Sequence, residues 1–581
     1  MMLLFVLLWS VVLAASGSLF SGYHLADDHE ILTIQEDLLK RPSGGVFSKW
    51  FWHDFDSMHR FRPFYFAHRI FLTRLLGTNF TAWFFYTGIL AVSATFLLYY
   101  GGRLTGFSVC ESALFALLTL LGRQAVVWWS LGPNESIAML LLSASWVCML
   151  LAIRSPRSGA SFRSVMVVTA VLAALSKENF VLLFPALIFL MAWTYRTEKK
   201  TTWSRSWTSN APTAFVLLFF MALDLFVIGR SIGVDGYGRH GGGIDRSSLL
   251  TLFQTALDVT LSFSTIGAGW IILFISLAFM VLFWHRYSRK NIESLRTNVV
   301  PSLILFGLIT VPQFMIYARC GIHGRYILPI VLGYAGLLVS LLRFLRINDF
   351  RFGFDGRDFV GFLVVVLSGF AGLWLFFVKR SFLVPERAFW LRIGFSFAMI
   401  MIAATVCLAG FLFFIRHRMR CNKQGFSFYR FALGLTVLLV FYKMVLSFTG
   451  ARAFAQHGRD TQAFFGLIEK HTQANDFTIL VIDHEGLKNE AAYSIQEFLR
   501  IKMRRPCAPL IVAQDFTGFR PKVSRDKKKP ESVSFVAVFS DLERDFLQCS
   551  PPWFHRSDYT RVQNGIFVSY FLEAPREADI P

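Results

Sequence analysis

Four consecutive polar residues, Asp27-Asp28-His29-Glu30, directly follow an apolar N-terminal run over residues 2–20. Carboxylates at the point where hydrocarbon gives way to water are costly to desolvate, so they usually hold a proton, a cation or a reacting hydroxyl. The structural alternative for Asp27 and Asp28 is an N-cap of a helix that begins near Glu30. These carboxylates are the first candidates for proton transfer in the chain.

Four more polar segments stand between apolar runs. They are Gly132-Pro133-Asn134-Glu135, Ser176-Lys177-Glu178-Asn179, Gly236-Tyr237-Gly238-Arg239-His240 and Arg319-Cys320-Gly321-Ile322-His323-Gly324-Arg325-Tyr326. The early segments carry carboxylates, and the later ones carry cations and histidine. Such a set can hold a phosphate with Arg and Lys while a carboxylate accepts a proton from a nearby hydroxyl.

Each of these candidates also has a purely structural interpretation. Lys177 and Glu178 can form an interfacial pair at a tight helical hairpin, and Glu135 can favour a helix N-terminus through the helix dipole. Arg325 and Tyr326 can be snorkelling anchors at the membrane surface.

The glycine-rich segment and the histidines of the first polar loop also have structural interpretations. The glycine-rich segment 236–243, with Tyr237, Arg239 and His240, is by default a flexible linker. The histidines of the first polar loop, which are His53, His59 and His68, are expected to be interfacial polar residues rather than metal ligands. No metal or other cofactor requirement follows from the sequence.

The composition indicates a polytopic α-helical membrane protein. Of 581 residues, 55% are hydrophobic and only 16% are charged, too few for the surface of a soluble protein of this size. The net charge of +21 invites a nucleic-acid function, which we reject because most basic residues fall in short loops between apolar spans. There they fix topology and attract anionic lipid headgroups. The seven Cys form no CxxC metal motif.

Apolar runs of about 20 residues, the length that crosses a bilayer, predict about thirteen spans. They lie near residues 2–20, 80–100, 107–122, 135–153, 162–176, 179–195, 211–229, 258–284, 298–317, 326–345, 358–378, 391–415 and 429–449. The first run is alternatively a cleaved signal peptide, with a processing site at Ala14-Ala15-Ser16. Cleavage would leave Asp27 and Asp28 on the same side of the membrane.

The distribution of basic residues predicts the orientation. With a cytoplasmic N-terminus, the inner loops carry nearly twice as many Lys and Arg as the short outer loops. The bias predicts a cytoplasmic N-terminus and an extracytoplasmic C-terminus. All five polar segments then share the outer face. The expected location is a bacterial inner membrane, or the endoplasmic reticulum membrane in a eukaryote.

Two regions are predicted outside the bundle. Residues 21–79 form a first external loop of interfacial amphipathic helices, within a membrane domain over residues 1–449. Residues 450–581 are predicted to form a small extracytoplasmic α/β domain. Its expected strands are 477–482, 510–513, 532–540 and 566–571, with a helix over 488–502. Cys507 and Cys549 lie in this region, where a disulfide is possible but not set by spacing.

Several motifs in order resemble a known group of membrane enzymes. They are the Asp pair after the first span, Arg60-Phe61-Arg62-Pro63-Phe64-Tyr65-Phe66, Val126-Val127-Trp128-Trp129, Ser176-Lys177-Glu178-Asn179 followed by Pro185, and Gly324-Arg325-Tyr326-Ile327-Leu328-Pro329. Together they resemble the GT-C superfamily of lipid-linked-sugar glycosyltransferases, in the branches of protein O-mannosyltransferases and aminoarabinose transferases. The segment 132–135 departs from the Gly-Arg-Ser-Asp pattern of one branch, which puts sugar contacts there in doubt. The tail lacks the Trp-Trp-Asp signature of oligosaccharyltransferases.

The resemblance implies a GT-C-like fold, a polyprenyl-phosphate monosaccharide as donor, and inversion at the anomeric carbon. It implies that the phosphate lies at the membrane surface and the isoprenoid tail in a groove between helices. Asp27 or Asp28 is implied as the general base that deprotonates an acceptor hydroxyl on a protein, a lipid or a glycan. Implied phosphate-binding residues are Lys177, Arg325, Arg319 and Arg239. Implied sugar-orienting residues are Glu30, Glu135, Glu178, His323 and Tyr326.

Two other classes of function compete with a glycosyltransferase. A lipid or glycolipid transporter or flippase usually places charges at mid-membrane and breaks its helices there. In this chain the notable charges sit at span ends, with Asp224 the main exception. A non-catalytic assembly protein is the third possibility, and it predicts that changes at Asp27 and Asp28 leave the pathway active.

Overall fold

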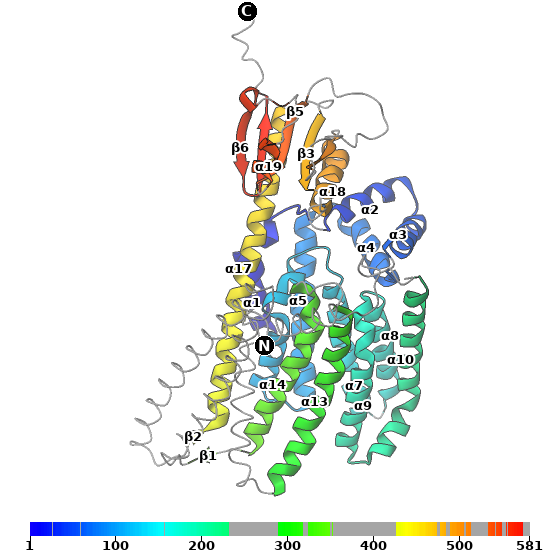
Figure 1. The fold of residues 1–581 in the computed structure, drawn as a ribbon. Helices are drawn as coiled ribbons and strands as arrows, with labels where there is room; N and C mark the ends of the chain where they lie inside the picture. The colour runs from blue at the N-terminus through cyan, green and yellow to red at the C-terminus, as the bar shows by residue number, and fades with distance from the viewer. Residues whose placement is uncertain are drawn as a thin grey trace, which may run out of the picture.

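The chain is mainly helical (Figure 1), as seen in a computed structural model. The structure describes residues 1–231, 289–317, 324–348, 351–352, 426–472, 477–483, 489–504, 507–512, 533–548, 554 and 556–572, without Ala26, His59, Pro156 and Asp541. Three predicted spans, 258–284, 358–378 and 391–415, lie outside these residues. The predicted total of thirteen therefore stays a prediction.

Six helical stretches in the described part are long and apolar enough to cross a membrane, which makes this an integral membrane protein. They are Phe80–Thr105, Glu135–Arg154, Glu178–Lys199, Trp203–Gly229, Gly324–Asn348 and Ala432–His471. Shorter apolar helices cover Met2–Ala15, Val109–Leu120, Gly159–Ala174 and Val299–Phe314. These ten segments coincide with ten of the predicted spans.

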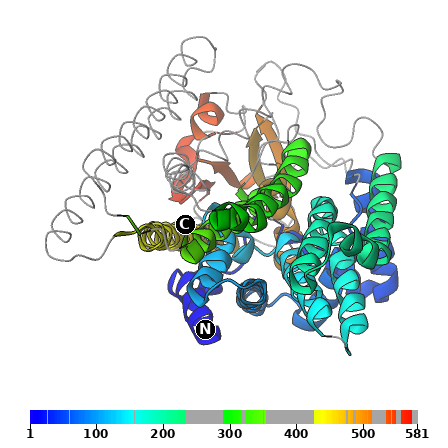
Figure 2. The same ribbon diagram turned by 90° about the horizontal axis from the view of Figure 1, so that it is seen from below.

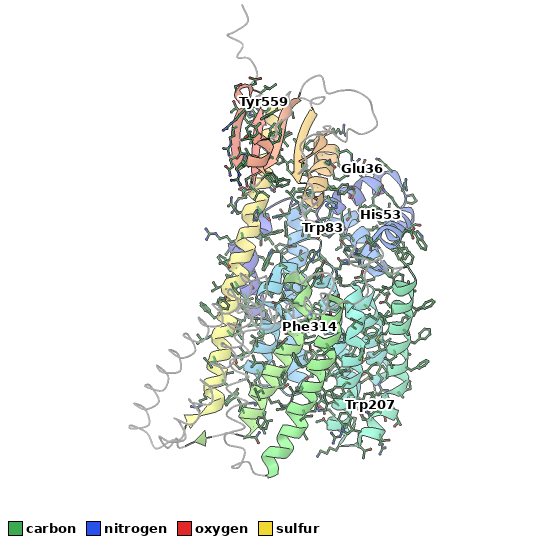
Figure 3. All side chains as sticks on the ribbon, in the orientation of Figure 1. Glu36, His53, Trp83, Trp207, Phe314 and Tyr559 are labelled. Carbon is green, nitrogen blue, oxygen red and sulfur yellow. The ribbon has the colours of Figure 1, made fainter. Side chains whose placement is uncertain are left out.

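The helices of the bundle carry the labels of Figure 1. They are α1 (Met2–Ser10, continued by a π-helical turn Val11–Ala15), α5 (Phe80–Thr105), α6 (Val109–Leu120), α7 (Glu135–Arg154), α8 (Gly159–Ala174), α9 (Phe184–Lys199), α10 (Trp203–Ser231), α13 (Arg289–Tyr317) and α14 (Leu328–Asn348). Large apolar side chains on α10, such as Phe215, Phe219 and Phe226, are exposed. Figure 3 shows Trp207 of α10 at the edge of the bundle. Such a surface is expected to face lipid.

Several polar side chains inside the bundle donate to hydroxyl or backbone oxygens, within one segment or between helices far apart in the sequence. Trp9 Nε1 donates to Thr95 Oγ1 at 2.8 Å. At the end of α6, Gln124 Nε2 donates to the carbonyls of Thr119 and Leu121 at 2.9 and 2.6 Å. Unpaired carbonyls at a helix end are costly in hydrocarbon, so this side chain closes α6.

The first loop folds into three helices, α2 (His29–Lys40), α3 (Ser43–Met58) and α4 (Pro63–Leu76). They lie together beside the end of the bundle that carries the sheet (Figure 1). Pro63 occupies the first turn of α4, where a missing N–H costs no hydrogen bond. The apolar side of α2 packs against α3 and α4 through Ile34, Val46 and Ile70.

A five-stranded mixed sheet follows the bundle, with strand order β4-β3-β5-β7-β6. Its strands are β3 (Phe477–Asp483), β4 (Cys507–Val512), β5 (Val533–Phe539), β6 (Thr560–Asn564) and β7 (Phe567–Phe571). The helix α18 (Asn489–Phe498) and the π-helical turn Leu499–Met503 follow β3, and α19 (Glu543–Gln548) follows β5. Four strands and α18 overlap the predicted elements, whereas β6 was not predicted. A short pair, β1 (Arg351–Phe352) and β2 (Phe426–Ser427), is separate.

One helix joins the bundle to the sheet. The 44 residues of α17 (Phe428–His471) span about 65 Å at 1.5 Å per residue, twice the hydrocarbon thickness of about 30 Å. Figure 1 shows α17 running along the bundle and on to the sheet, and the view from below in Figure 2 shows it beside α14. Phe464, Phe465 and Ile468 near its end pack against Phe535 and Phe567 of the sheet. The domain boundary predicted after residue 449 falls inside this continuous helix.

Candidate active site

Asp27 and Arg325 form an ion pair although 298 residues separate them. Arg325 Nη1 lies 3.0 Å from Asp27 Oδ2, and both side chains remain partly exposed. Asp27 has a φ of 64°, a left-handed conformation that Asp tolerates better than most residues. The turn at Asp27 ends just before α2, and Arg325 lies in the 3-10 turn Gly324–Ile327 just before α14. The pair therefore joins the first loop to a late span.

A second ion pair lies beside the first. Lys177 Nζ is 3.3 Å from Glu135 Oε1, and both side chains are almost fully buried. The ring of Tyr326 connects the two pairs, because Lys177 Nζ lies 4.9 Å from its centroid and Arg325 Cζ lies 5.2 Å from it. Two cations near one aromatic ring can be stabilised by the ring quadrupole. The site thus combines two cations, two carboxylates and one phenol.

The segment 132–135 packs tightly under this cluster. A Cβ at Gly132 would overlap the side chain of Asp27, so only glycine allows the two segments to approach this closely. Asn134 Nδ2 donates to the carbonyl of Ser176 at 3.1 Å, which ties the starts of α7 and of the 3-10 turn Glu178–Leu183. Four of the five predicted polar segments therefore meet at one end of the bundle.

Asp28 differs sharply from its neighbour. It is completely buried, its Oδ2 accepts a hydrogen bond from the backbone N–H of His24 at 2.9 Å, and no hydrogen-bond partner of Oδ1 is found among the described residues. Burial raises the pKa of Asp28 well above its usual range, against the lowering effects of the His24 N–H hydrogen bond and of Arg69, and the nearby Asp27 and Glu30 raise it further. It occupies the N-cap position of α2 but makes no side-chain cap bond.

Arg69 of α4 is a central residue that sequence reasoning missed. Its guanidinium donates to the carbonyl of Leu131 and, at 3.2 Å, to the carbonyl of Asp27, and its Nε lies 3.7 Å from Glu30. Only 3% of the residue is exposed. Arg69 therefore fixes the backbone of the Asp27 turn against the segment before Gly132. The available signal was an arginine in the middle of a largely apolar helix, whose other arginine, Arg74, lies in its last turn.

A second missed group borders Glu178. Arg62 forms a bidentate ion pair with Asp54, at 2.7 and 3.0 Å, and its Nε lies 3.6 Å from Glu178 Oε1. Arg62 belongs to the motif 60–66 that carried the sequence resemblance, but no role was predicted for it. Glu178 thus lies in this arginine-centred group rather than in the Asp27–Arg325 cluster.

Tyr65 links the two groups. Its hydroxyl donates to Glu30 Oε2 at 2.5 Å, and Arg62 and Arg69 lie 5.3 and 6.0 Å from its ring. Burial raises the pKa of Tyr65 well above its usual range, so the phenol stays protonated and acts as a donor. Glu30 is held by Tyr65 and Arg69.

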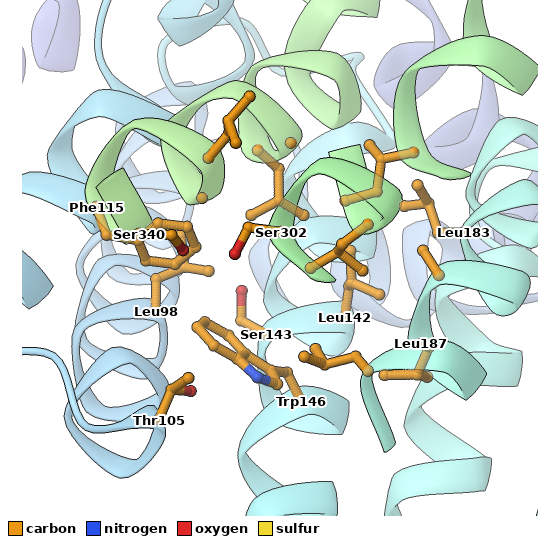
Figure 4. Close-up of a pocket in the computed structure, with 18 of the residues that line it drawn as sticks. Leu98, Thr105, Phe115, Leu142, Ser143, Trp146, Leu183, Leu187, Ser302 and Ser340 are labelled. Atoms are coloured by element: carbon orange, nitrogen blue, oxygen red, sulfur yellow. The ribbon is translucent and has the colours of Figure 1, made fainter. Parts of the chain in front are cut away.

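An apolar cavity of about 100 Å³ lies deeper in the bundle, between α5, α6, α7, α9, α13 and α14. Most of its lining is leucine and aromatic side chains, and Figure 4 shows Ser143, Ser302 and Ser340 around it together with Trp146. Leu142 and Leu332 lie seven residues beyond Glu135 and Arg325 respectively, which places the cavity about 10 Å below the charged cluster.

Some predicted site residues cannot be placed. Arg319, Arg239 and His323, with Tyr237 and His240, lie outside the described residues. His68 contacts the hydroxyl of Tyr86 at 2.6 Å, and its pKa is lowered to about 4 by burial. Within the described ranges, no three His, Cys, Asp or Glu residues are grouped as metal ligands. The proposed absence of a metal stays an expectation.

In sequence, the chain matches no protein-family model and no curated protein. In structure, it is similar to ArnT from Cupriavidus metallidurans, a GT-C aminoarabinose transferase. The form bound to undecaprenyl phosphate has a TM-score of 0.44 at 14% identity, covering 98% of this chain and 97% of the other. The apo form has a TM-score of 0.46 at 14% identity, covering 97% of each chain. Both TM-scores are low, so the function proposed below rests on this chain's own residues.

Proposed function

We propose that the protein is a membrane glycosyltransferase that moves a monosaccharide from a polyprenyl-phosphate donor to a hydroxyl acceptor. The observation that carries this proposal is the contact of Asp27 with Arg325 beside Lys177 and Tyr326. A carboxylate next to two cations at the end of a helical bundle suits a reaction in which a hydroxyl loses a proton while a phosphate departs. The motifs that resemble GT-C enzymes contribute the same residues.

Asp27 is the proposed general base, and Asp28 is not. Asp27 is partly exposed, so an acceptor hydroxyl can reach it, whereas Asp28 is completely buried behind the His24 backbone. In the proposed step, Asp27 takes the proton of the acceptor hydroxyl and the acceptor oxygen attacks the anomeric carbon. The bond from that carbon to the phosphate oxygen breaks with its electron pair, and the configuration inverts.

Arg325 and Lys177 are the proposed phosphate ligands. Each already pairs with a carboxylate, Asp27 and Glu135 respectively. A donor phosphate would compete with Asp27 for the Arg325 guanidinium and so release the base for proton transfer. Cations fixed in a water-poor site stabilise charge that develops on a leaving phosphate. Tyr326 is proposed to hold both cations in place.

The apolar cavity is the proposed start of the binding path for the isoprenoid tail. It lies on α7, which begins at Glu135, and on α14, which follows the turn that holds Arg325, about 10 Å further along these helices. An apolar cavity below a charged cluster matches the two chemical halves of a polyprenyl phosphate. Glu30, Glu135 and Glu178 are proposed to orient the sugar or the cations, and Arg69 is proposed as a positioning residue for Asp27.

The orientation of the membrane domain is part of the proposal. The N-terminus is proposed to be cytoplasmic, with the site and the C-terminal sheet on the extracytoplasmic face, as the basic residues of the loops predict. The acceptor is a hydroxyl of a protein, a lipid or a glycan. The cell envelope of a bacterium is the proposed setting.

Sugar transfer from a defined donor tests the assignment of the base. Purified Asp27→Asn protein is expected to lose transfer from a polyprenyl-phosphate sugar by at least about a hundredfold, the lower range for a general base. Asp28→Asn is expected to retain most of it. Mass spectrometry of cells with and without the gene identifies the glycoconjugate that is missing without it. This glycoconjugate is the product to measure in the transfer assay. Full transfer by the Asp27→Asn variant would remove Asp27 from catalysis.

The role of Arg325 has a separate test. Arg325→Ala is expected to lower kcat/KM for the donor by about a hundredfold, the usual effect of losing one group that stabilises developing charge. Arg325→Lys keeps the charge and is expected to recover part of the loss. Arg452→Ala, which removes a cation at an exposed position of α17, is the control and is expected to leave kcat/KM unchanged. An unchanged donor KM and kcat in Arg325→Ala would exclude Arg325 from the phosphate site.

A further inference from the structure

A pocket with polar and apolar lining residues lies at the opposite end of α2 from Asp27. It is formed where α2 ends, α3 begins and α4 ends. Its volume is about 350 Å³, and its lining is Gln35, Leu38, Leu39, Arg41, Pro42, Ser43 and Arg74. This volume falls in the range of sites that bind small molecules. The pocket shares no residue with the candidate active site.

The charge of the pocket is positive. Arg41 and Arg74 are its charged lining residues, and the lining contains no carboxylate. The acids of α2 are engaged elsewhere, because Glu36 pairs with Lys40 and Arg500 while Asp37 pairs with Lys49. Arg74 Nη1 donates to Ser43 Oγ at 3.3 Å, which keeps this guanidinium beside a hydroxyl at the pocket wall. Two guanidinium groups and a hydroxyl are suited to a phosphate.

The backbone around the pocket also favours the binding of an anion. Ser43 lines the pocket and begins the 16-residue helix α3, so the partly positive N-terminus of α3 lies at the pocket wall, and the space beside Gly44 is open. The end of α2 contributes the opposite partial charge, but a helix end carries only about half a charge. Two full guanidinium charges outweigh it.

Apolar side chains flank the pocket on the protein surface. Leu39, Phe71 and Leu75 are 78%, 64% and 68% exposed, and Phe71 and Leu75 neighbour Arg74 on α4. Arg74 precedes the span α5 by six residues, so it lies near the membrane boundary. An inorganic anion gains no binding energy from these exposed apolar side chains. A phospholipid can place its acyl chains against them while its phosphate occupies the pocket.

We propose that this pocket binds the phosphate of an anionic phospholipid in the membrane leaflet that borders the candidate active site. Arg41 and Arg74 bind the headgroup, and Leu39, Phe71 and Leu75 contact its acyl chains. Because α2 begins next to Asp27 and ends at Arg41, the lipid also anchors the helix that leads from the site to the membrane surface.

Lipid binding to the full-length protein in detergent tests the proposal. The probe is dioctanoyl phosphatidylglycerol, and native mass spectrometry measures its dissociation constant. Arg41→Gln and Arg74→Gln are each expected to weaken binding by about fivefold, and the double variant by about twenty-five-fold, from the usual contribution of one basic residue near a lipid surface. Lys40→Gln removes the same charge one residue away, outside the pocket lining, and is expected to stay within twofold of the unchanged protein.

Three results would overturn the proposal. The first is a double variant that binds phosphatidylglycerol as tightly as the unchanged protein. The second is equal affinity for dioctanoyl phosphatidylcholine, which would mean that the apolar surface alone binds lipid. The third is competition by millimolar inorganic phosphate, which would make the pocket a site for free anions. If the double variant does not fold, the two single variants provide the same comparison with Lys40→Gln.

Discussion

At the scale of single residues, two adjacent aspartates hold opposite positions in this protein. Asp27 faces Arg325 and is partly open to solvent, whereas Asp28 is enclosed beneath His24. The left-handed turn at Asp27 makes this possible, because it directs consecutive side chains to different sides of the loop. The same residue type therefore provides an ion-pair partner at one position and a buried acid at the next.

The buried acid predicts a pH-dependent stability. The folded protein holds the pKa of Asp28 above the unfolded value of about 3.9, so the native state binds this proton more tightly than the unfolded state does. The protonated Asp28 therefore contributes its full stabilisation to the folded state below a pH of about 4. This stabilisation is lost as the pH rises towards the pKa of Asp28 in the folded protein. In that window the free energy of unfolding falls by up to about 1.4 kcal/mol per pH unit.

Asp28→Asn measures this contribution directly. The unfolding temperature of the unchanged protein minus that of the variant is expected to decrease from pH 4 to pH 8, since asparagine does not titrate. Asp558→Asn, at an exposed position of the sheet region, provides the control and is expected to give a flat difference. A flat difference for Asp28→Asn as well would show that Asp28 is ionised in the folded state at all these pH values.

At the scale of elements, the ends of helices position the site. The spans α7 and α14 and the 3-10 turn Glu178–Leu183 begin at the cluster, so each contributes the residues of its first turn or of the segment just before it. The last carbonyl groups of a helix also need hydrogen-bond donors. At the end of α6, directly before the segment that leads to Gly132, the side-chain amide of Gln124 is the donor.

Replacement of Gln124 tests this closure of α6. Gln124→Leu removes the donor to the carbonyls of Thr119 and Leu121, and each buried carbonyl left without a partner costs about 1–3 kcal/mol. We therefore expect a loss of about 2–4 kcal/mol in the free energy of unfolding, measured in detergent. Gln456→Leu, at an exposed position of α17, is expected to change it by less than about 0.5 kcal/mol. Equal effects of the two variants would contradict the closing role.

At the scale of the whole molecule, the sheet region and the first loop support each other. Tyr23 inserts between them, with its hydroxyl donating to the carbonyl of Ser494 on α18 at 2.8 Å and its ring 4.7 Å from that of Phe498. His29 Nδ1 lies 2.7 Å from Ser494 Oγ. Tyr23 lies four residues before Asp27 in the sequence, and His29 lies two residues after it. The sheet region therefore helps to hold the turn that presents Asp27.

Two variants of Tyr23 separate packing from hydrogen bonding. Tyr23→Ala is expected to cost about 3–5 kcal/mol, as for other large aromatic side chains removed from a core. Tyr23→Phe loses one hydrogen bond and is expected to cost about 1 kcal/mol. Hydrogen exchange should rise in both α2 and α18 for the alanine variant. A rise confined to one of the two helices would show that they are not coupled through Tyr23.

Much of the architecture follows from local sequence pattern. Ten apolar segments are helices because hydrocarbon leaves the backbone no other way to pair its polar groups, and the strands of the sheet carry β-branched and aromatic runs. The pattern missed β6, because its residues Thr560–Asn564 are mostly polar. The domain boundary at residue 449 stays a prediction, although the helix α17 is continuous there.

The sequence by itself determined the membrane class, the helices and the polar segments at their ends, because these depend on neighbouring residues and on the thickness of a bilayer. Only the tertiary structure decided which aspartate meets Arg325, and that Arg69 and Arg62 are buried partners rather than surface anchors. The reason is physical. A carboxylate or a guanidinium acquires its protonation, its accessibility and its partners from groups hundreds of residues away in the chain.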